Sequence, residues 1–154
     1  MKIYLASRYS RRLELCGYRE QLRAAGHQVD AVWLNGGHQI GDTGAPIGEA
    51  GVSVVEGDDG SSTEQAQHLR TKFAQDDFED VRNCDCLIAF TEFPRTGPTR
   101  GGRHVELGLA IGMKKTVIVC GPRENIFCWL PGVIHFETFA EALACVKGIA
   151  HSRV

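Results

Sequence analysis

Three short apolar runs in the chain have the length of buried strands. They are KIYLA at residues 2–6, CLIAF at 86–90 and TVIVC at 116–120. Between them lie segments whose apolar residues recur at helical spacing, which predicts helices. Strands that alternate with helices form a parallel sheet covered on both faces. The sequence therefore predicts an α/β fold: a single three-layer, doubly wound domain with a mostly parallel sheet of about five strands, flavodoxin-like or Rossmann-like.

Weaker signals complete this prediction. VDAVW at 29–33 is expected to be the second strand and VIHF at 133–136 the last one. Residues 34–61 are rich in Gly and Asp and have no clear period, which predicts a loop insertion (a lid, a binding loop or a disordered segment) with a short strand at 52–55. The whole chain, 1–154, is expected to form one domain. The predicted helices cover about residues 10–25, 61–84, 104–113 and 138–147.

Composition limits the functional classes. A net charge of −2 and a pI of about 6.3 give no reason to expect binding to a nucleic-acid polymer or a membrane surface. No apolar run approaches the roughly 20 residues of a membrane span, and the apolar stretch at the start is too short for a signal peptide. The six cysteines form no C-x-x-C pair and the six histidines are scattered, so we expect free thiols, a cytoplasmic location, no metal and no cofactor.

The stretch RGGRHVELGLAIG at 100–112 places a carboxylate, Glu106, near the start of a predicted helix. Gly101 and Gly102 before it allow another molecule to approach the backbone closely. Unpaired N–H groups and the positive end of the helix dipole favour an ionised carboxylate there. An ionised glutamate that faces a cleft can act as a nucleophile or a base, although a favourable helix-start residue with no partner would have the same pattern.

A second acid, Asp77, occupies a position in the apolar stripe of the predicted helix 61–84 where an apolar residue is expected. Asp76 or Asp80 could be the inward residue instead, or all three acids could be exposed to solvent. Two carboxyl groups that two helices bring to one edge of a sheet suit the chemistry of glycosidic bonds, in which one attacks the anomeric carbon and the other handles protons.

The segment SRYSRR at 7–12 follows the first predicted strand and is rich in arginine. At a strand-to-helix junction, N–H groups and guanidinium groups together can bind an anion, with a solvated basic turn as the alternative. Neither G-x-G-x-x-G nor G-x-x-x-x-G-K-[ST] occurs, so a dinucleotide site and a P-loop lose their main support. Trp33 could stack on a base, with a place in the core as the alternative.

Three segments together resemble the nucleoside 2-deoxyribosyltransferase superfamily, which includes the 2′-deoxynucleoside 5′-phosphate N-hydrolases. They are KIYLAS at 2–7, QDDFEDVRNCDCLIAF at 75–90 and GGRHVELGLAIGMKKTVIV at 101–119. The resemblance spans residues 2 to about 122. It implies that Glu106 attacks C1′ of the deoxyribose and carries the glycosyl intermediate. It also implies that Asp77, eight residues before Asp85, assists.

The resemblance further implies a substrate site that a neighbouring subunit completes. In that superfamily the segment after the first strand binds sugar and, in the hydrolases, phosphate. Members assemble as homodimers or larger homo-oligomers, and Asn125 is the candidate contribution from the neighbouring subunit. The candidate substrate-binding residues are Ser7, Arg8, Tyr9, Arg12, Trp33, Thr91, Gly101, Gly102, Arg103 and Asn125.

The arginines favour a phosphorylated small-molecule substrate. The predicted reaction is therefore cleavage of the N-glycosidic bond of a (deoxy)nucleoside 5′-monophosphate, with release of free base and deoxyribose 5-phosphate. The first alternative is a 2-deoxyribosyltransferase that exchanges bases on unphosphorylated nucleosides. A nucleoside monophosphate glycosidase of the cytokinin-activating type is a further alternative. The non-enzyme alternative is a nucleotide-sensing module that binds without turnover.

Overall fold

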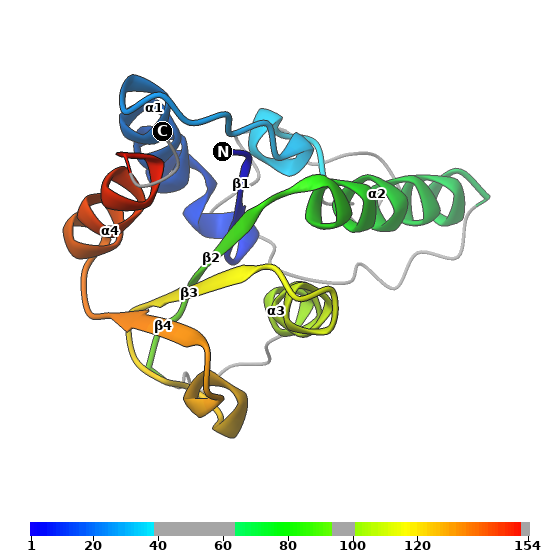
Figure 1. Cartoon of the computed structure of the whole chain (residues 1–154). Coiled ribbons are helices and arrows are strands. Elements are labelled where there is room, and N and C mark those ends of the chain that lie inside the picture. The colour runs from blue at the N-terminus through cyan, green and yellow to red at the C-terminus, as the bar shows by residue number, and fades with distance from the viewer. Residues whose placement is uncertain (39–63, 94–100, 152–154) are drawn as a thin grey trace.

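The protein is built on a parallel sheet, seen in a computed structural model that describes residues 1–38, 64–93 and 101–151 (Figure 1). In spatial order its strands are β1 (Ile3–Ala6), β2 (Cys86–Phe90), β3 (Thr116–Cys120) and β4 (Val133–Phe136). Every neighbouring pair of strands is parallel. The three strong apolar runs and the VIHF segment are therefore strands, as the sequence predicted. Within the described ranges the sheet has four strands rather than five.

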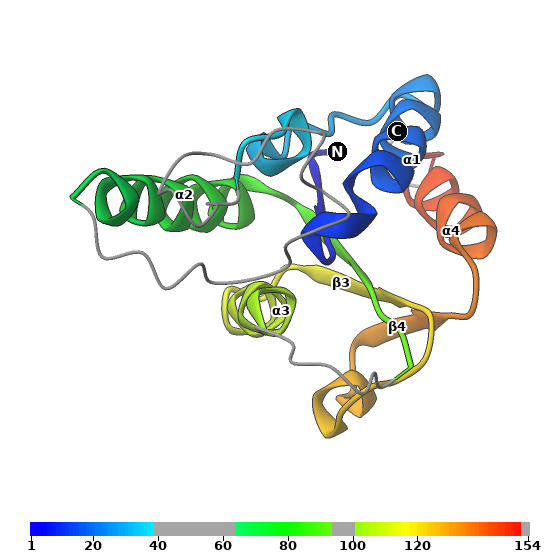
Figure 2. The ribbon, with the colours of Figure 1, turned by 180° about the vertical axis from the view of Figure 1, so that it is seen from behind.

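Helices cover both faces of this sheet. They are α1 (Arg12–Ala24), α2 (Glu64–Asn83), α3 (Gly102–Gly112) and α4 (Phe139–His151). Helices α1 and α4 lie on one face, and α2 and α3 lie on the other (Figures 1 and 2). On the first face, the ring of Tyr18 stacks 4.0 Å from that of Phe139 and 5.3 Å from that of Phe90, measured between centroids. The predicted three-layer, doubly wound architecture is confirmed.

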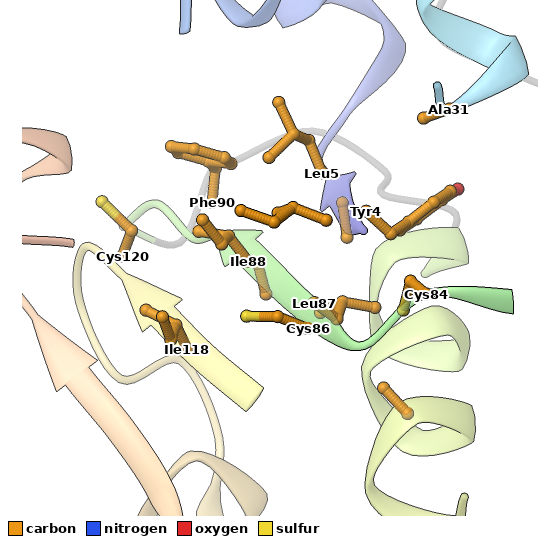
Figure 3. Packing of buried hydrophobic residues seen from close by; sticks show 14 of the residues in the cluster. Tyr4, Leu5, Ala31, Cys84, Cys86, Leu87, Ile88, Phe90, Ile118 and Cys120 are labelled. Atoms are coloured by element: carbon orange, nitrogen blue, oxygen red, sulfur yellow. The ribbon is translucent and has the colours of Figure 1, made fainter. Parts of the chain in front are cut away.

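In β1 and β2, successive side chains point to opposite faces of the sheet. Tyr4 lies opposite Leu87 in the β1–β2 register, and Leu5 lies opposite Ile88. All four side chains are buried in one continuous core (Figure 3). Because successive strand residues point to opposite faces, Tyr4 faces the layer of α2 and α3. The first strand thus presents one phenol to the layer that carries both predicted acids.

The predicted second strand at 29–33 is wrong. The chain makes one bridge there, Lys2 with Gln28, and then turns into a 3-10 helix, η2 (Val32–Asn35). The Asp80 carboxylate accepts the Val32 N–H at 2.6 Å, which supplies the partner that a strand ladder would have supplied. Apolar residues in this segment are buried, but burial alone does not distinguish a short strand from a short helix.

The remaining boundaries differ little from those predicted. A short 3-10 helix, η1 (Tyr9–Arg11), precedes α1, and α3 begins two residues before the predicted 104. All six cysteines are free, as expected. The predicted insertion at 34–61, its short strand at 52–55 and the start of helix 61–84 fall largely on residues 39–63, outside the described residues. No helix in the described ranges is long and apolar enough to cross a membrane.

Candidate active site

The centre of the candidate site is Glu106, in the second turn of α3. The chain enters this helix through Gly101, whose φ of +75° is one that residues with a Cβ rarely adopt. One carboxylate oxygen, Oε1, accepts a hydrogen bond from the Tyr4 hydroxyl at 2.7 Å. The other, Oε2, is buried and has no hydrogen-bond partner in the described part of the protein. One oxygen is therefore fixed and the other is left available.

Asp77 of α2 belongs to the same cluster. Its Oδ1 is buried and, among the described residues, has no hydrogen-bond partner. The neighbouring acids face elsewhere: Asp76 pairs with Lys72, and Asp80 accepts the Val32 N–H. Of the three acids that the sequence left open, Asp77 is the one whose pKa is raised by the charge of Glu106, and its own charge raises the pKa of Tyr4.

Burial controls the protonation of the two acids. It raises the pKa of Glu106 to about 7, against the hydrogen bond from Tyr4 and the positive charge of Arg103. Burial, and after it the charge of Glu106, raises the pKa of Asp77 to about 8. Burial therefore opposes the ionised Glu106 carboxylate that the sequence led us to expect at a helix start. Near neutral pH the pair is poised to hold one proton.

The sequence interpretation missed Tyr4. It is only 1% exposed, and burial, followed by the charges of Glu106 and Asp77, raises the pKa of its phenol well above the usual range. It therefore stays protonated and donates. A tyrosine inside an apolar strand was the available signal, since a buried phenol needs a hydrogen-bond partner. Two carboxyl groups and one phenol on the α2 and α3 side of the sheet can supply a nucleophile, a proton donor and an orienting hydrogen bond.

Two of the predicted arginines lie in a second cluster, where the strands end. We call it the edge network; its members are Arg8, Glu92, Arg103 and Glu124. Arg103 donates from Nη2 to both oxygens of Glu124 at 2.7 Å, and Nη1 lies 3.3 Å from the Phe90 carbonyl. Arg8 Nε lies 2.5 Å from Glu92 Oε1. Both arginines therefore have acidic partners within the protein.

Three other candidates are held by the fold rather than turned to the cluster. Arg12 is 2% exposed and donates to the Leu34 carbonyl at 2.7 Å. Trp33 is 5% exposed and donates from Nε1 to the Leu5 carbonyl at 2.9 Å, so it is a core residue and does not present its ring to a base. Thr91 is buried, with its hydroxyl 3.2 Å from the Cys120 carbonyl.

The remaining candidates lie around the ends of the strands. Ser7 Oγ, just after β1, is buried without a hydrogen-bond partner in the described ranges. The Tyr9 hydroxyl accepts the Gly37 N–H at 2.8 Å. The side-chain oxygen of Asn125 accepts the Phe127 N–H at 2.9 Å, and its amide nitrogen lies 3.3 Å from Nδ1 of His104. Gly102 is the first residue of α3, after Gly101.

Metal-binding side chains do not gather in this part of the molecule. In the ranges 1–38, 64–93 and 101–151, no group of three His, Cys, Asp or Glu residues could hold a metal ion.

Comparison with known proteins identifies the class of fold. No protein-family model and no curated protein matches the chain. A 2-deoxyribosyltransferase from Bacillus psychrosaccharolyticus matches with a TM-score of 0.56 at 20% identity, over 93% of this chain and 90% of that one. The CMP N-glycosidase from Clostridium botulinum matches with a TM-score of 0.51 at 19% identity, over 96% of this chain and 98% of that one. The protein therefore shares its fold with these two.

Proposed function

We propose that the protein is an enzyme that cleaves the N-glycosidic bond of a (deoxy)nucleoside 5′-monophosphate, releasing free base and deoxyribose 5-phosphate. The observation that carries this proposal is the buried cluster of Tyr4, Asp77 and Glu106. Two adjacent carboxyl groups with raised pKa values are typical of a nucleophile and an acid–base catalyst that share a site. The fold, shared with a deoxyribosyltransferase and a CMP N-glycosidase, supports the same chemistry.

In the first step, an oxygen of the ionised Glu106 carboxylate attacks C1′ of the sugar. The bond from C1′ to the base nitrogen breaks, and its electron pair leaves with the base. Asp77, which holds its proton at neutral pH, protonates the departing base. Tyr4 fixes Oε1 of Glu106 through its hydrogen bond, which leaves Oε2 to face the sugar. The carboxylate also stabilises the positive charge that develops at C1′.

In the second step, water attacks C1′ of the glycosyl ester. Asp77, now ionised, takes a proton from the water, the bond to Glu106 breaks, and its electron pair returns to the carboxylate. Deoxyribose 5-phosphate leaves, and both acids regain their initial protonation. The two roles of Asp77 require a pKa near the working pH, and its pKa of about 8 meets that requirement.

The end of the first strand supports a phosphorylated substrate. Ser7 Oγ and the Arg8 guanidinium follow β1 and could donate to phosphate oxygens. A second candidate is the transfer of deoxyribose between bases of unphosphorylated nucleosides. The edge network favours it, because Glu92 and Glu124 already balance the charges of Arg8 and Arg103.

We also propose that the protein is a single-domain, cytoplasmic homodimer. Support for self-association comes from large apolar side chains exposed on a 3-10 helix, η4 (Ile126–Trp129), which directly follows Asn125. Ile126 is 79% exposed and Trp129 is 67% exposed. Sedimentation equilibrium tests the dimer, and replacement of Trp129 by serine is expected to weaken it. Six free cysteines suit a reducing compartment.

A chromatographic assay for free base tests the proposed reaction. The protein is incubated with deoxynucleoside 5′-monophosphates and with their nucleosides, with and without an acceptor base. Release from monophosphates without an acceptor supports the hydrolase, whereas exchange only with an acceptor supports the transferase. Ligand binding without release from any compound would contradict both and leave a nucleotide-binding module.

A further inference from the structure

Glu92 stands out in the edge network because, among the described arginines, its carboxylate lies much closer to Arg8 than to Arg103. It follows β2 by two residues, and its N–H donates to Glu124 Oε1 at 2.8 Å, which fixes the backbone. Its Oε1 lies 2.5 Å from Arg8 Nε but 3.8 Å from Arg103 Nη1. Arg103 already has the bidentate carboxylate of Glu124. Among the described residues, Glu92 is therefore primarily a counter-ion of Arg8.

The pair is sheltered enough for its charges to matter. The side chains of Arg8 and Glu92 are 13% and 20% exposed. At such sites solvent screens charges less than at a fully exposed surface. Next to Arg8, Ser7 Oγ is buried and has no hydrogen-bond partner in the described ranges. Ser7 Oγ and the Arg8 guanidinium are both donors that suit a phosphate, and the Glu92 carboxylate already pairs with Arg8.

We infer that Glu92 is a specificity-determining residue: its carboxylate holds Arg8 in the place of a substrate phosphate, and so sets the balance between phosphorylated and unphosphorylated substrates. This inference rests on the proposed function. A phosphate that approaches Arg8 must displace Glu92 and is repelled by its charge. A neutral 5′-hydroxyl leaves the Arg8–Glu92 pair intact.

The test replaces Glu92 by glutamine, which keeps its size and removes its charge. The values of kcat/KM are measured for a deoxynucleoside and for its 5′-monophosphate. We expect the ratio of monophosphate to nucleoside to rise about tenfold in Glu92→Gln, because the Arg8 guanidinium no longer has a charged carboxylate that competes with the phosphate. In the double variant with Arg8→Gln this rise should disappear. A ratio that rises less than about threefold in Glu92→Gln overturns the inference.

Glu14→Gln is the matched control, because Glu14 also pairs with an arginine, Arg11 at 2.7 Å, but on the outer surface of α1. It should leave the ratio unchanged. A second measurement does not depend on turnover: calorimetric binding of deoxyribose 5-phosphate, which Glu92→Gln should tighten about tenfold. If no compound releases base but this tightening occurs, the proposed function fails and the role of Glu92 stands. Unchanged binding together with an unchanged ratio removes the inference and leaves the proposed reaction intact.

Discussion

The buried cluster of Tyr4, Asp77 and Glu106 and the edge network use the same kind of acid in opposite ways. In the edge network each carboxylate faces a guanidinium, at 2.5 Å for Glu92 and 2.7 Å for Glu124. In the buried cluster one carboxyl group accepts a hydrogen bond from a phenol, no described guanidinium pairs with either carboxyl group, and burial raises their pKa values to about 7 and 8. Pairing with a cation fixes a charge in place, whereas burial without one keeps a proton exchangeable. Only the second arrangement suits acid–base chemistry near neutral pH.

Replacing Glu106 by glutamine should cause the largest loss of activity among the changes to the buried cluster. The amide cannot form the glycosyl ester, so base release should fall by about 10³-fold or more. The chromatographic assay measures the rate. Glu79→Gln, an exposed glutamate of α2 paired with Arg82 at 2.9 Å, is the matched control and should retain full activity. A Glu106→Gln protein with near-normal turnover would remove Glu106 as the nucleophile.

Replacing Asp77 by asparagine should have the next largest effect. Loss of the proton donor should lower kcat by about 10²-fold. In the unmodified protein, activity should also fall as pH rises above about 8, where Asp77 loses its proton, and this limb should be absent in the variant. The pH–rate profile is the measurement. Asp76→Asn, one position along the same helix, is the control, and an equal loss in it would argue against a specific role for Asp77.

The two regions should also differ in how stability depends on pH. Asp77 has a raised pKa, so between about pH 4 and pH 8 the folded protein binds more protons than the unfolded chain. Its contribution to stability is therefore greatest at low pH and is lost as pH rises through about 8. As pH rises from 5 to 9, the free energy of unfolding of Asp77→Asn should rise by roughly 4 kcal/mol relative to that of the unmodified protein, as measured by thermal unfolding at each pH. A constant difference across that range would contradict the raised pKa.

Replacing Glu124 by glutamine should weaken the edge network in a different manner. Arg103 would keep a neutral partner but lose a charge-assisted, bidentate one, which should lower the free energy of unfolding by about 2 kcal/mol. Denaturant unfolding of the variant and of the unmodified protein measures this loss. An unchanged free energy of unfolding would show that the edge network does not stabilise the fold.

Removing the Tyr4 hydroxyl should have the smallest of these effects. Tyr4→Phe takes away the hydrogen bond to Glu106 Oε1, which favours the ionised carboxylate. The Glu106 pKa should rise above about 7, and kcat at pH 7 should fall about tenfold. The acidic limb of the pH–rate profile reports the pKa. Tyr18→Phe is the control, since its hydroxyl donates at 2.9 Å to Glu14 on the other face of the sheet.

The sequence predicted the fold better than the electrostatics of the site. Apolar runs such as 86–90 identified strands because both of their faces are buried. The prediction of a strand at 29–33 was wrong. The Val32 N–H is bonded by the Asp80 carboxylate, which lies far along the chain and is not visible in the local sequence pattern. Stripe spacing had singled out Asp77, and the charge of Glu106 acts on this acid. Its protonation was not predictable from spacing, because desolvation depends on the packed layers around it.

The surroundings of the arginines were likewise not predictable from the sequence. Their clustering in the sequence suggested free positive charge for a phosphate. The acids that balance them come from distant positions: Glu92 lies 84 residues after Arg8, and Glu124 lies 21 residues after Arg103. Sequence patterns detect neighbours on one helix or strand, whereas ion pairs between elements depend on the topology of the sheet. The likeness to known enzymes held at the level of the fold, which the three quoted segments had indicated.

The short helix η2 has a consequence for how the protein avoids association through its sheet. Among the described residues, only the Lys2–Gln28 bridge lies beyond β1, which makes β1 the border strand of the described sheet, and a border strand can pair with a strand of another chain. On that border, the Gln28 carbonyl accepts the Ile3 N–H at 2.8 Å, and the Trp33 indole donates to the Leu5 carbonyl at 2.9 Å. One backbone group and one indole thus occupy hydrogen-bonding positions that an intruding strand would need. In the described part of the sheet, these two groups shield the strand that carries Tyr4 against edge-to-edge aggregation.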